Sequence, residues 1–436
     1  MTMNRRKFLT TTGLTALAAS CAPPALMSQP LPNVTAPEQL KKLQHEGLQK
    51  QLLLGYPINM KTPPEAFFEW RKQLMAAGLN RFAFNNVGNP YDQSHIPFNS
   101  HQFEKALINR FAAVYGFAQD DVWGFLTNSG TDSNMHGLYM GRTLLKKRTG
   151  VLPKIYFTQE AHYSIQILSN VLNLEAVIVK TDTQGNMDVA DLESKLADNA
   201  NHPALIVATI GTTFKGAIDP IDEIQRKLRN RQAYLHLDAA LFGGYLPHTA
   251  FASDLLQQDM NPEQGAARHH RYDSIAVSCH KFFGFPSPAG LFITTRKIFE
   301  EFLQPFSEIH DPEYILQIPG TITCSRDAVK PAEFYFFSSE SALAQQAKDA
   351  NTILENARYL YQEMKTHYAN LQPTRVSEKS NIVYFRKPSD KIVNKYLLAV
   401  MRVNQEGERI PCAHVVVMPH AEKSVLDQFL TDLGKT

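Results

Sequence analysis

The chain has 436 residues, of which 44% are hydrophobic and 20% are charged, and its net charge at pH 7 is +2. These proportions are typical of a globular protein with a large core, and they exclude a disordered or fibrous chain. A charge this close to zero gives no reason to expect nucleic acid or an acidic surface as a partner. The four cysteines have neither metal-ligand spacing nor the pattern of a disulfide framework, so no metal site is expected.

The first 25 residues have the pattern of an export signal. Arg5 and Arg6 precede a short, mildly apolar stretch rich in Ala, Leu and Thr, which is too short to span a membrane as a helix. Paired arginines at this position are typical of a twin-arginine signal. Cys21 follows Ala-Ala-Ser, as at a lipoprotein cleavage site. We therefore expect an exported protein, periplasmic or held at the cell envelope by a lipid on Cys21; the alternative is a disordered basic tail.

From about residue 122, short apolar runs alternate with helical patterns. The helix over 134–148 follows Thr131, Asp132 and Ser133, which are expected to cap it. Unbroken Val, Ile and Leu runs between helices predict an α/β fold with a mainly parallel sheet that is buried on both faces. The predicted strands are 154–158, 175–180, 204–210, 233–240, 274–278 and 290–295, and the further predicted helices are 163–174, 189–199 and 221–231.

The pattern changes after about residue 329. Apolar residues from Leu343 to Met364 alternate spacings of four and three, which predicts a long amphipathic helix, and two short strand patterns and a last helix follow it. This part is expected to be a small α+β domain. The chain is thus expected to comprise an export signal, an N-terminal arm, a large domain and a small C-terminal domain, over residues 1–25, 26–80, 81–328 and 329–436.

Chemistry is expected where the parallel strands stop, because ligands in such sheets bind beyond the carboxyl ends of the strands. Five polar or glycine-rich segments stand at those ends and together predict a single crevice. They are "LTNSGTDSN" (126–134), "TQEAHYS" (158–164), "IGTTFKGAID" (210–219), "HLDAALFGG" (236–244) and "SCHKFFG" (278–284).

A lysine, an aspartate and a histidine at strand ends, with a glycine-rich helix start, are the set that pyridoxal phosphate requires. Lys281 would bind the cofactor aldehyde covalently, and Asp238 would keep the pyridine nitrogen protonated. An aromatic side chain would stack on the ring, and backbone amides at the helix start would hold the phosphate. Taken singly, Lys281 would be a surface lysine, Asp238 a helix cap and His162 a structural histidine.

These segments resemble the group II pyridoxal-phosphate-dependent amino acid decarboxylases, and most closely the bacterial histidine decarboxylases. The resemblance extends over roughly residues 52–433 and is strongest in "TNSGTDSNMHGLYMGR", "EAHYSIQ", "IGTTFKGAID", "HLDAALFGGYLP" and "SCHKFFGFPSPAG". It implies a fold-type I enzyme that uses pyridoxal 5'-phosphate and forms a homodimer with its sites at the interface. The implied reaction is that of a carboxy-lyase acting on an L-amino acid, and the family members that the chain resembles most closely convert histidine to histamine.

Carried over by position, the resemblance gives each residue a role. Lys281 would be the cofactor lysine, Asp238 the partner of the pyridine nitrogen, and His162 the stacking residue that also touches the substrate. Tyr314, Lys281 and His162 are all candidates to return a proton to the substrate carbon, and Arg326 is expected to reach the neighbouring subunit's cofactor. The residues expected to bind or border the phosphate or to leave room for the ring are Gly130, Thr131, Ser278, His280 and Ala240.

Departures from the family bear on the substrate. Ile318-Pro319-Gly320 replaces a His-Asp-Lys stretch, Phe285 stands where a serine is common, and Asn89-Pro90 replaces Asp-Trp. We interpret these changes as altering the residues around the substrate, while the residues that bind the cofactor are kept. The alternatives to histidine decarboxylation are decarboxylation of another aromatic, acidic or basic amino acid, an aminotransferase using Arg402 or Arg409, and a non-catalytic exported relative.

Overall fold

The computed structural model describes residues 37–257, 270–307, 318–405 and 408–435. The chain divides into two units, Met1–Lys50 and Gln51–Thr436, and each is described by itself. The described part of the first unit is mainly helix α1 (Pro37–Leu48). The predicted export signal, with Cys21, lies outside the described residues, as does Tyr314. The four-part division of the chain stays a prediction.

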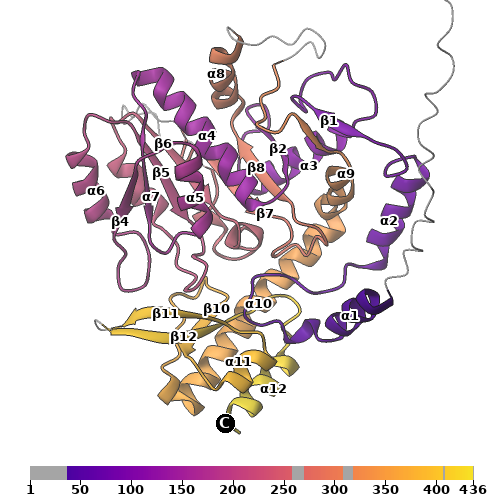
Figure 1. The fold of residues 1–436 in the computed structure, drawn as a ribbon, viewed down its shortest axis with the longest axis vertical. Helices are drawn as coiled ribbons and strands as arrows, with labels where there is room; N and C mark the ends of the chain where they lie inside the picture. Colours follow the sequence, from indigo (N-terminus) through magenta and orange to yellow (C-terminus); the bar gives the residue numbers. More distant parts are fainter. Residues whose placement is uncertain (1–36, 258–269, 308–317, 406–407, 436) are drawn as a thin grey trace, which may run out of the picture. The chain divides into compact units, whose positions relative to one another are not determined.

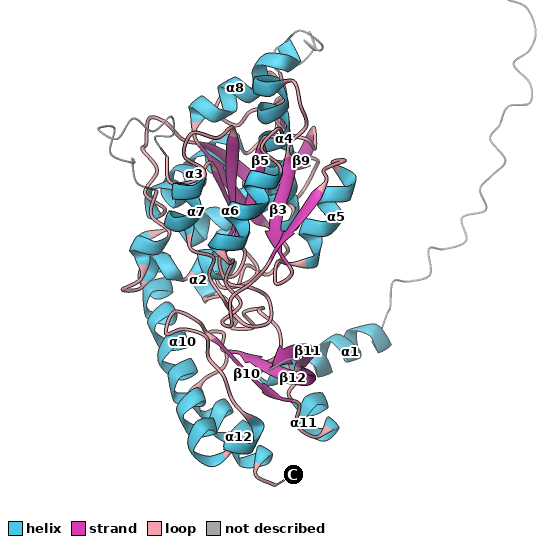
Figure 2. Ribbon diagram, turned by 90° about the vertical axis from the view of Figure 1, so that its left-hand side faces the viewer, coloured by secondary structure: helices cyan, strands magenta, loops and turns pink. Residues whose placement is uncertain are grey.

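The second unit contains a seven-stranded sheet with helices on both faces (Figures 1 and 2). Strand β8 is antiparallel to both of its neighbours, β2 and β7, and the other neighbouring strands are parallel. The predicted α/β fold with a mainly parallel sheet is therefore confirmed. In spatial order the strands are β2 (Trp123–Thr127), β8 (Gly290–Thr294), β7 (Ser274–Ser278), β6 (Ala233–Asp238), β5 (Ala204–Thr209), β3 (Lys154–Thr158) and β4 (Ala176–Val179).

Helix α4 (Gly130–Thr149) follows β2 and packs on the sheet against β6, β7 and β8. Two glycines allow this close packing, because a Cβ on Gly137 would lie 2.4 Å from the His236 ring and one on Gly141 would lie 2.3 Å from Leu205. The other helices of the large sheet's layers are α3 (His101–Val114), α5 (Tyr163–Val171), α6 (Val189–Asp198), α7 (Ile221–Lys227) and α8 (Arg296–Ser307).

The start of α4 differs from the prediction. Thr131, Asp132 and Ser133 lie inside the first turn, and Ser129 is the N-cap instead. Ser129 has extended backbone angles, and its Oγ accepts a hydrogen bond from the Asp132 amide at 3.2 Å. The helix consequently begins earlier, and its first amides lie directly at the carboxyl end of β2.

The C-terminal part is a three-stranded antiparallel sheet with helices, as predicted for an α+β region. Its strand order is β10 (Ile382–Arg386), β12 (Glu408–Val416) and β11 (Ala399–Gln405), and its helices are α10 (Glu340–His367), α11 (Asp390–Lys395) and α12 (Lys423–Leu433). A separate antiparallel pair joins β1 (Asn85–Val87) to β9 (Ser325–Asp327), flanked by α2 (Glu65–Ala76) and α9 (Val329–Phe334). No helix in the described ranges has both the length and the apolar character that crossing a bilayer requires.

Candidate active site

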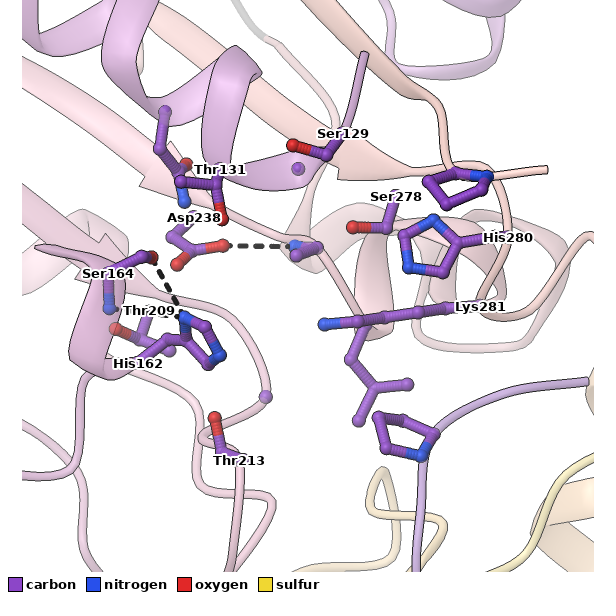
Figure 3. Close-up of a pocket in the computed structure, with 17 residues that line it drawn as sticks. Ser129, Thr131, His162, Ser164, Thr209, Thr213, Asp238, Ser278, His280 and Lys281 are labelled. Carbon is purple, nitrogen blue, oxygen red and sulfur yellow. Dashed lines mark hydrogen bonds between the residues drawn. The ribbon is translucent and has the colours of Figure 1, made fainter. Parts of the chain in front are cut away.

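A cavity of about 210 Å³ lies beyond the carboxyl ends of the parallel strands. The turns after β2, β3, β5, β6 and β7 all contribute to its wall, so the five segments at the predicted crevice do meet (Figure 3). The predicted site residues that line it are Gly130, Thr131, His162, Asp238, Ala240, Ser278, His280 and Lys281. The described residues contain no group of three or more His, Cys, Asp or Glu side chains that could hold a metal ion.

Lys281 stands three residues after the end of β7, and its side chain reaches into the cavity (Figure 3). Burial lowers the pKa of its amine, and the nearby carboxylate of Asp238 partly opposes that shift. A lowered pKa favours the neutral amine, which is the nucleophilic form. The His-Lys pair that follows β7 therefore places a lysine side chain in a buried cavity and not in bulk water.

Asp238 is the last residue of β6 and is only 4% exposed. One carboxylate oxygen accepts a hydrogen bond from the Ala240 amide at 3.2 Å. The other has no hydrogen-bond partner among the described residues, although a buried carboxylate is costly without one. The arrangement suits a cationic partner in the cavity, such as a protonated pyridine nitrogen.

The N-terminus of α4 forms a cradle for an anion. The Ser129 hydroxyl caps the amide of Asp132, which leaves the amides of Gly130 and Thr131 without an acceptor in the part of the chain that the structure describes. A Cβ on Gly130 would come within 2.3 Å of Ser278 Oγ, so only glycine leaves this space open. Exposed amides and a hydroxyl at a helix N-terminus are what a phosphate requires.

His162 is the N-cap residue of α5, and its ring faces the cavity. Its Nδ1 lies 2.8 Å from Ser164 Oγ and accepts a hydrogen bond from the Ser164 amide at 3.3 Å. Burial lowers the pKa of His162; Asp238 raises it and Lys281 lowers it further. Burial, the largest of these influences, thus favours the neutral imidazole.

His280 lies in the wall of the cavity opposite His162 (Figure 3). Its Nδ1 donates to the carbonyl oxygen of Ala289 at 3.4 Å. Burial lowers the pKa of His280, and the neighbouring amine of Lys281 adds to the shift. His280 therefore borders the cavity as a neutral ring with a fixed orientation.

Sequence reasoning missed further residues of the cavity wall. Asn134 is oriented by His236, whose Nε2 lies 2.9 Å from the Asn134 Oδ1. His236 is fully buried, as expected for a core residue, and burial lowers its pKa to about 3. Most of the missed residues stand inside or next to the five strand-end segments, whereas no sequence feature around Pro57 indicates a place in the cavity wall. They are Pro57, Ser129, Asn134, Ser164, Thr209, Gly211, Thr213, Leu241 and Pro288.

Two residues interpreted as surrounding the substrate do not line the cavity. Phe285 is 2% exposed and packs in the core against Phe334, with ring centroids 5.3 Å apart. Asn89 accepts a hydrogen bond from the Trp123 indole at 2.8 Å, away from Lys281. Neither side chain lines the cavity of this chain that contains Lys281, and the interpretation that they surround the substrate stays a prediction.

Arg326 makes its contacts within its own chain, and the expectation that it reaches a neighbouring subunit stays a prediction. Its guanidinium forms an ion pair with Glu104 of the same chain, and both side chains are almost completely buried. Arg326 also lies over the ring of Phe125, 4.9 Å from its centroid. The guanidinium is thus paired with a carboxylate and an aromatic ring of its own chain.

The cavity fits pyridoxal phosphate on its own features. It combines a desolvated lysine, a buried carboxylate with one oxygen free, and an anion cradle that a single Cβ would fill. Lys281 would hold the aldehyde, Asp238 the ring nitrogen, and the α4 N-terminus with Ser278 the phosphate.

Comparisons with known proteins agree with this chemistry. Histidine decarboxylases of Solanum lycopersicum and Pseudomonas entomophila are 33% and 32% identical to the chain, covering 88% and 81% of it and 84% and 81% of their own lengths. Serine decarboxylase 2 of Oryza sativa subsp. japonica is 34% identical over 90% of the chain and 76% of its own length.

A solved structure shows the same fold. L-methionine decarboxylase of Streptomyces sp.590 superposes with a TM-score of 0.76 at 21% identity, over 91% of this chain and 94% of that one. The family model described as the pyridoxal-dependent decarboxylase conserved domain matches residues 113–386. The predicted cofactor, pyridoxal 5'-phosphate, and the predicted carboxy-lyase class are thereby confirmed. The chain belongs to the pyridoxal-dependent decarboxylase family.

Proposed function

We propose that the amino acid that this decarboxylase converts is L-histidine, giving histamine and carbon dioxide. The observation that carries the proposal is the likeness to histidine decarboxylases from a plant and a bacterium over more than four fifths of the chain. L-Serine is the second candidate, since a rice serine decarboxylase is 34% identical. Both substrates need the same cofactor site and differ only in the side chain that must be accommodated.

Room for a substrate side chain adjoins the lysine cavity. A second cavity of about 810 Å³ shares Pro57, His162 and Thr213 with it. Aromatic side chains, Tyr56 and Phe214 among them, line this space. A planar imidazole can pack against aromatic side chains, whereas the serine side chain offers no flat apolar surface for this contact.

The residues of the site divide the work of decarboxylation. Bound pyridoxal phosphate supplies a ring that accepts the electron pair left when carbon dioxide departs. Asp238, whose carboxylate is buried, would favour a positive charge on the ring nitrogen of the bound cofactor. Burial lowers the pKa of the Lys281 amine and so favours the neutral form, which could exchange places with the substrate amine.

The aminotransferase alternative has little support. Arg402 and Arg409 line another cavity, together with Glu160 and Lys215, and neither lines the cavity that contains Lys281. A carboxylate-binding arginine in that role has to face the cofactor. The non-catalytic alternative is opposed by Lys281 and Asp238 occupying one cavity.

An absorbance titration tests the function. The purified protein with pyridoxal phosphate should show a visible band that borohydride removes and that Lys281→Ala lacks. The matched control is Lys423→Ala, whose exposed amine pairs with Asp427 on α12 and should keep the band. Histidine should shift the band and yield histamine. A shift and an amine with serine alone would overturn histidine as the substrate, and no band in the unmodified protein would overturn the cofactor assignment.

We further propose that the protein is a homodimer, which the family resemblance supports. Sedimentation of the full chain with its cofactor should give twice the mass of 49.1 kDa. A single species at the monomer mass over the micromolar range would overturn this.

We also propose export by the twin-arginine route with a lipid on Cys21, on the evidence of the sequence alone. Replacing Arg5 and Arg6 with lysine should retain the protein in the cytoplasm, whereas Cys21→Ala should release it from the envelope into the soluble exported fraction. An unchanged distribution in both variants would contradict the proposal.

A further inference from the structure

His162 is an unusual helix cap. N-cap positions favour Ser, Thr, Asp and Asn, whose short side chains accept from the first-turn amides. At the start of α5 an imidazole does this, because the Ser164 amide donates to His162 Nδ1 at 3.3 Å. The Ser164 hydroxyl lies still closer to the same nitrogen, at 2.8 Å, and Ser164 is only 3% exposed.

The two contacts determine which ring nitrogen carries the proton. A backbone N–H can only donate, so Nδ1 must present its lone pair, and the hydroxyl can donate to that lone pair as well. The proton of the neutral ring is then on Nε2. In Figure 3 the Ser164 contact is on one edge of the ring, and the other ring nitrogen lies on the side of the Lys281 amine.

We propose that Ser164 is a positioning residue that keeps His162 neutral, with Nδ1 as acceptor and Nε2–H as a hydrogen-bond donor toward the bound substrate and cofactor. A proton on Nδ1 would face the hydrogen of the Ser164 backbone amide, so the hydrogen bond that caps α5 would be lost. His162 therefore does not supply the proton that returns to the substrate carbon, which leaves Lys281 and Tyr314 of the three candidates. The inference rests on the decarboxylase site but not on which amino acid it takes.

The electrostatic surroundings agree with a neutral ring. The groups that act on His162 are the carboxylate of Asp238 and the amine of Lys281, which have opposite effects on its charge. Burial is the larger influence and favours the uncharged form. The hydrogen-bond geometry then selects one of the two neutral tautomers.

Nitrogen NMR tests the proposal directly. The full-length protein is labelled with ¹⁵N-histidine and loaded with pyridoxal phosphate, and the signals of His162 are assigned by their loss in His162→Gln. At about pH 8, above the ordinary histidine pKa, Nδ1 should be unprotonated and Nε2 protonated, and the cofactor-free protein should show the same pattern. A proton on Nδ1, or on both nitrogens, would overturn the proposal.

Variants of α5 separate positioning from folding. Ser164→Ala removes the 2.8 Å hydroxyl contact and keeps the 3.3 Å amide contact, so the tautomer should stay while the ¹⁵N signal of Nδ1 shifts through the loss of its closer donor. The looser ring should lower kcat by about tenfold, the effect of one hydrogen bond, with little change in KM. Ser164→Thr should restore both readouts. The matched control is Ser169→Ala, which loses a buried hydrogen bond to the Ile165 carbonyl of the same helix, 2.7 Å long, and should leave the tautomer and kcat unchanged.

Failure of this proposal and failure of the substrate proposal are distinguishable. The tautomer is read without substrate, so absence of histamine with an Nε2–H tautomer would discard only histidine. Equal losses of kcat in Ser164→Ala and Ser169→Ala, with the Nδ1 signal of His162 unchanged in both, would show a structural role and overturn the positioning role of Ser164.

Discussion

The backbone amide of Asn59 donates a hydrogen bond to the carbonyl oxygen of Lys281 at 3.2 Å, and its side-chain amide donates to the Phe282 carbonyl at 2.8 Å. Gly284 makes room for this contact, because its φ of +72° is left-handed and a Cβ there would lie 2.8 Å from the Asn59 amide nitrogen. A residue of the predicted N-terminal arm thus binds the loop that carries Lys281 in the same chain.

Asn59→Ala should loosen the lysine loop. The carbonyl of Phe282 loses its donor in a partly buried place, and we expect a loss of about 1–2 kcal/mol in the free energy of unfolding together with faster release of the cofactor. Urea denaturation and the decay of cofactor absorbance after dilution measure the two effects.

Asn356→Ala is the matched control for that change. The Asn356 amide donates to the Ala421 carbonyl at 3.3 Å in the C-terminal part, far in sequence from Lys281. This variant should lose a similar amount of stability and release the cofactor at the original rate. Equal release rates in both variants would contradict a role of Asn59 at the lysine.

The sequence predicts the strands of the large sheet well because each buried strand is an unbroken apolar run, and the six strands predicted there appear within two residues of their bounds. It also predicts the wall residues that stand at strand ends. Contacts between distant segments are different: nothing near Asn59 indicates that it pairs with Lys281, and nothing near Arg326 indicates that it pairs with Glu104. Such pairings depend on tertiary packing, which the local pattern does not encode.

Gly130→Ala should weaken cofactor binding. In an ordinary helix this change stabilises by about 1 kcal/mol, but here the added Cβ would collide with Ser278 Oγ at 2.3 Å. We expect at least about a tenfold loss of affinity for pyridoxal phosphate, since the clash displaces the hydroxyl or the helix start by more than a hydrogen bond tolerates. Fluorescence titration of the cofactor-free protein measures it.

Gly47→Ala controls for the helix propensity in that experiment. Gly47 lies in α1, and no atom stands within 4 Å of the position that a Cβ would take there. Alanine should therefore be neutral or slightly stabilising at this position and should leave cofactor affinity unchanged. If Gly130→Ala bound the cofactor as tightly as Gly47→Ala, the anion cradle at α4 would be refuted.

Breaking the Glu104–Arg326 pair should be costly. The side chains are 0% and 3% exposed, and Glu104 also accepts hydrogen bonds from the amide of Leu126 and from the side chain of Asn86. Arg326→Met leaves a buried carboxylate without its cation, so we expect a loss of about 3–5 kcal/mol in the free energy of unfolding. Chemical denaturation measures it.

The exposed pair Lys423–Asp427 provides the comparison. Its side chains are 60% and 45% exposed, and Lys423→Met should cost less than about 1 kcal/mol. A loss of similar size in the two variants would mean that the buried pair contributes no more than a surface one.

Stability should fall in acid because histidines are buried in their neutral form. Burial lowers the pKa of His136 and of His236 to about 3, whereas the same groups have a pKa near 6.5 when the chain is unfolded. Between these values the unfolded chain binds protons that the native protein does not bind. The stabilisation is therefore complete above pH 6.5 and is lost as the pH falls, by about 1.4 kcal/mol per pH unit for each histidine.

His236→Asn isolates one of these contributions. The variant loses packing and absolute stability, but the slope of its unfolding free energy between about pH 6 and pH 4 should be shallower by about 1.4 kcal/mol per pH unit, because one proton fewer is taken up on unfolding. Ser274→Ala is the matched control: it removes the hydroxyl that lies 2.7 Å from His236 Nδ1 and keeps the histidine. It should therefore lower stability without changing the slope. A slope in His236→Asn equal to that of the unmodified protein would mean that His236 is already charged in the native state, and the neutral pair with Asn134 in the cavity wall would have to be abandoned.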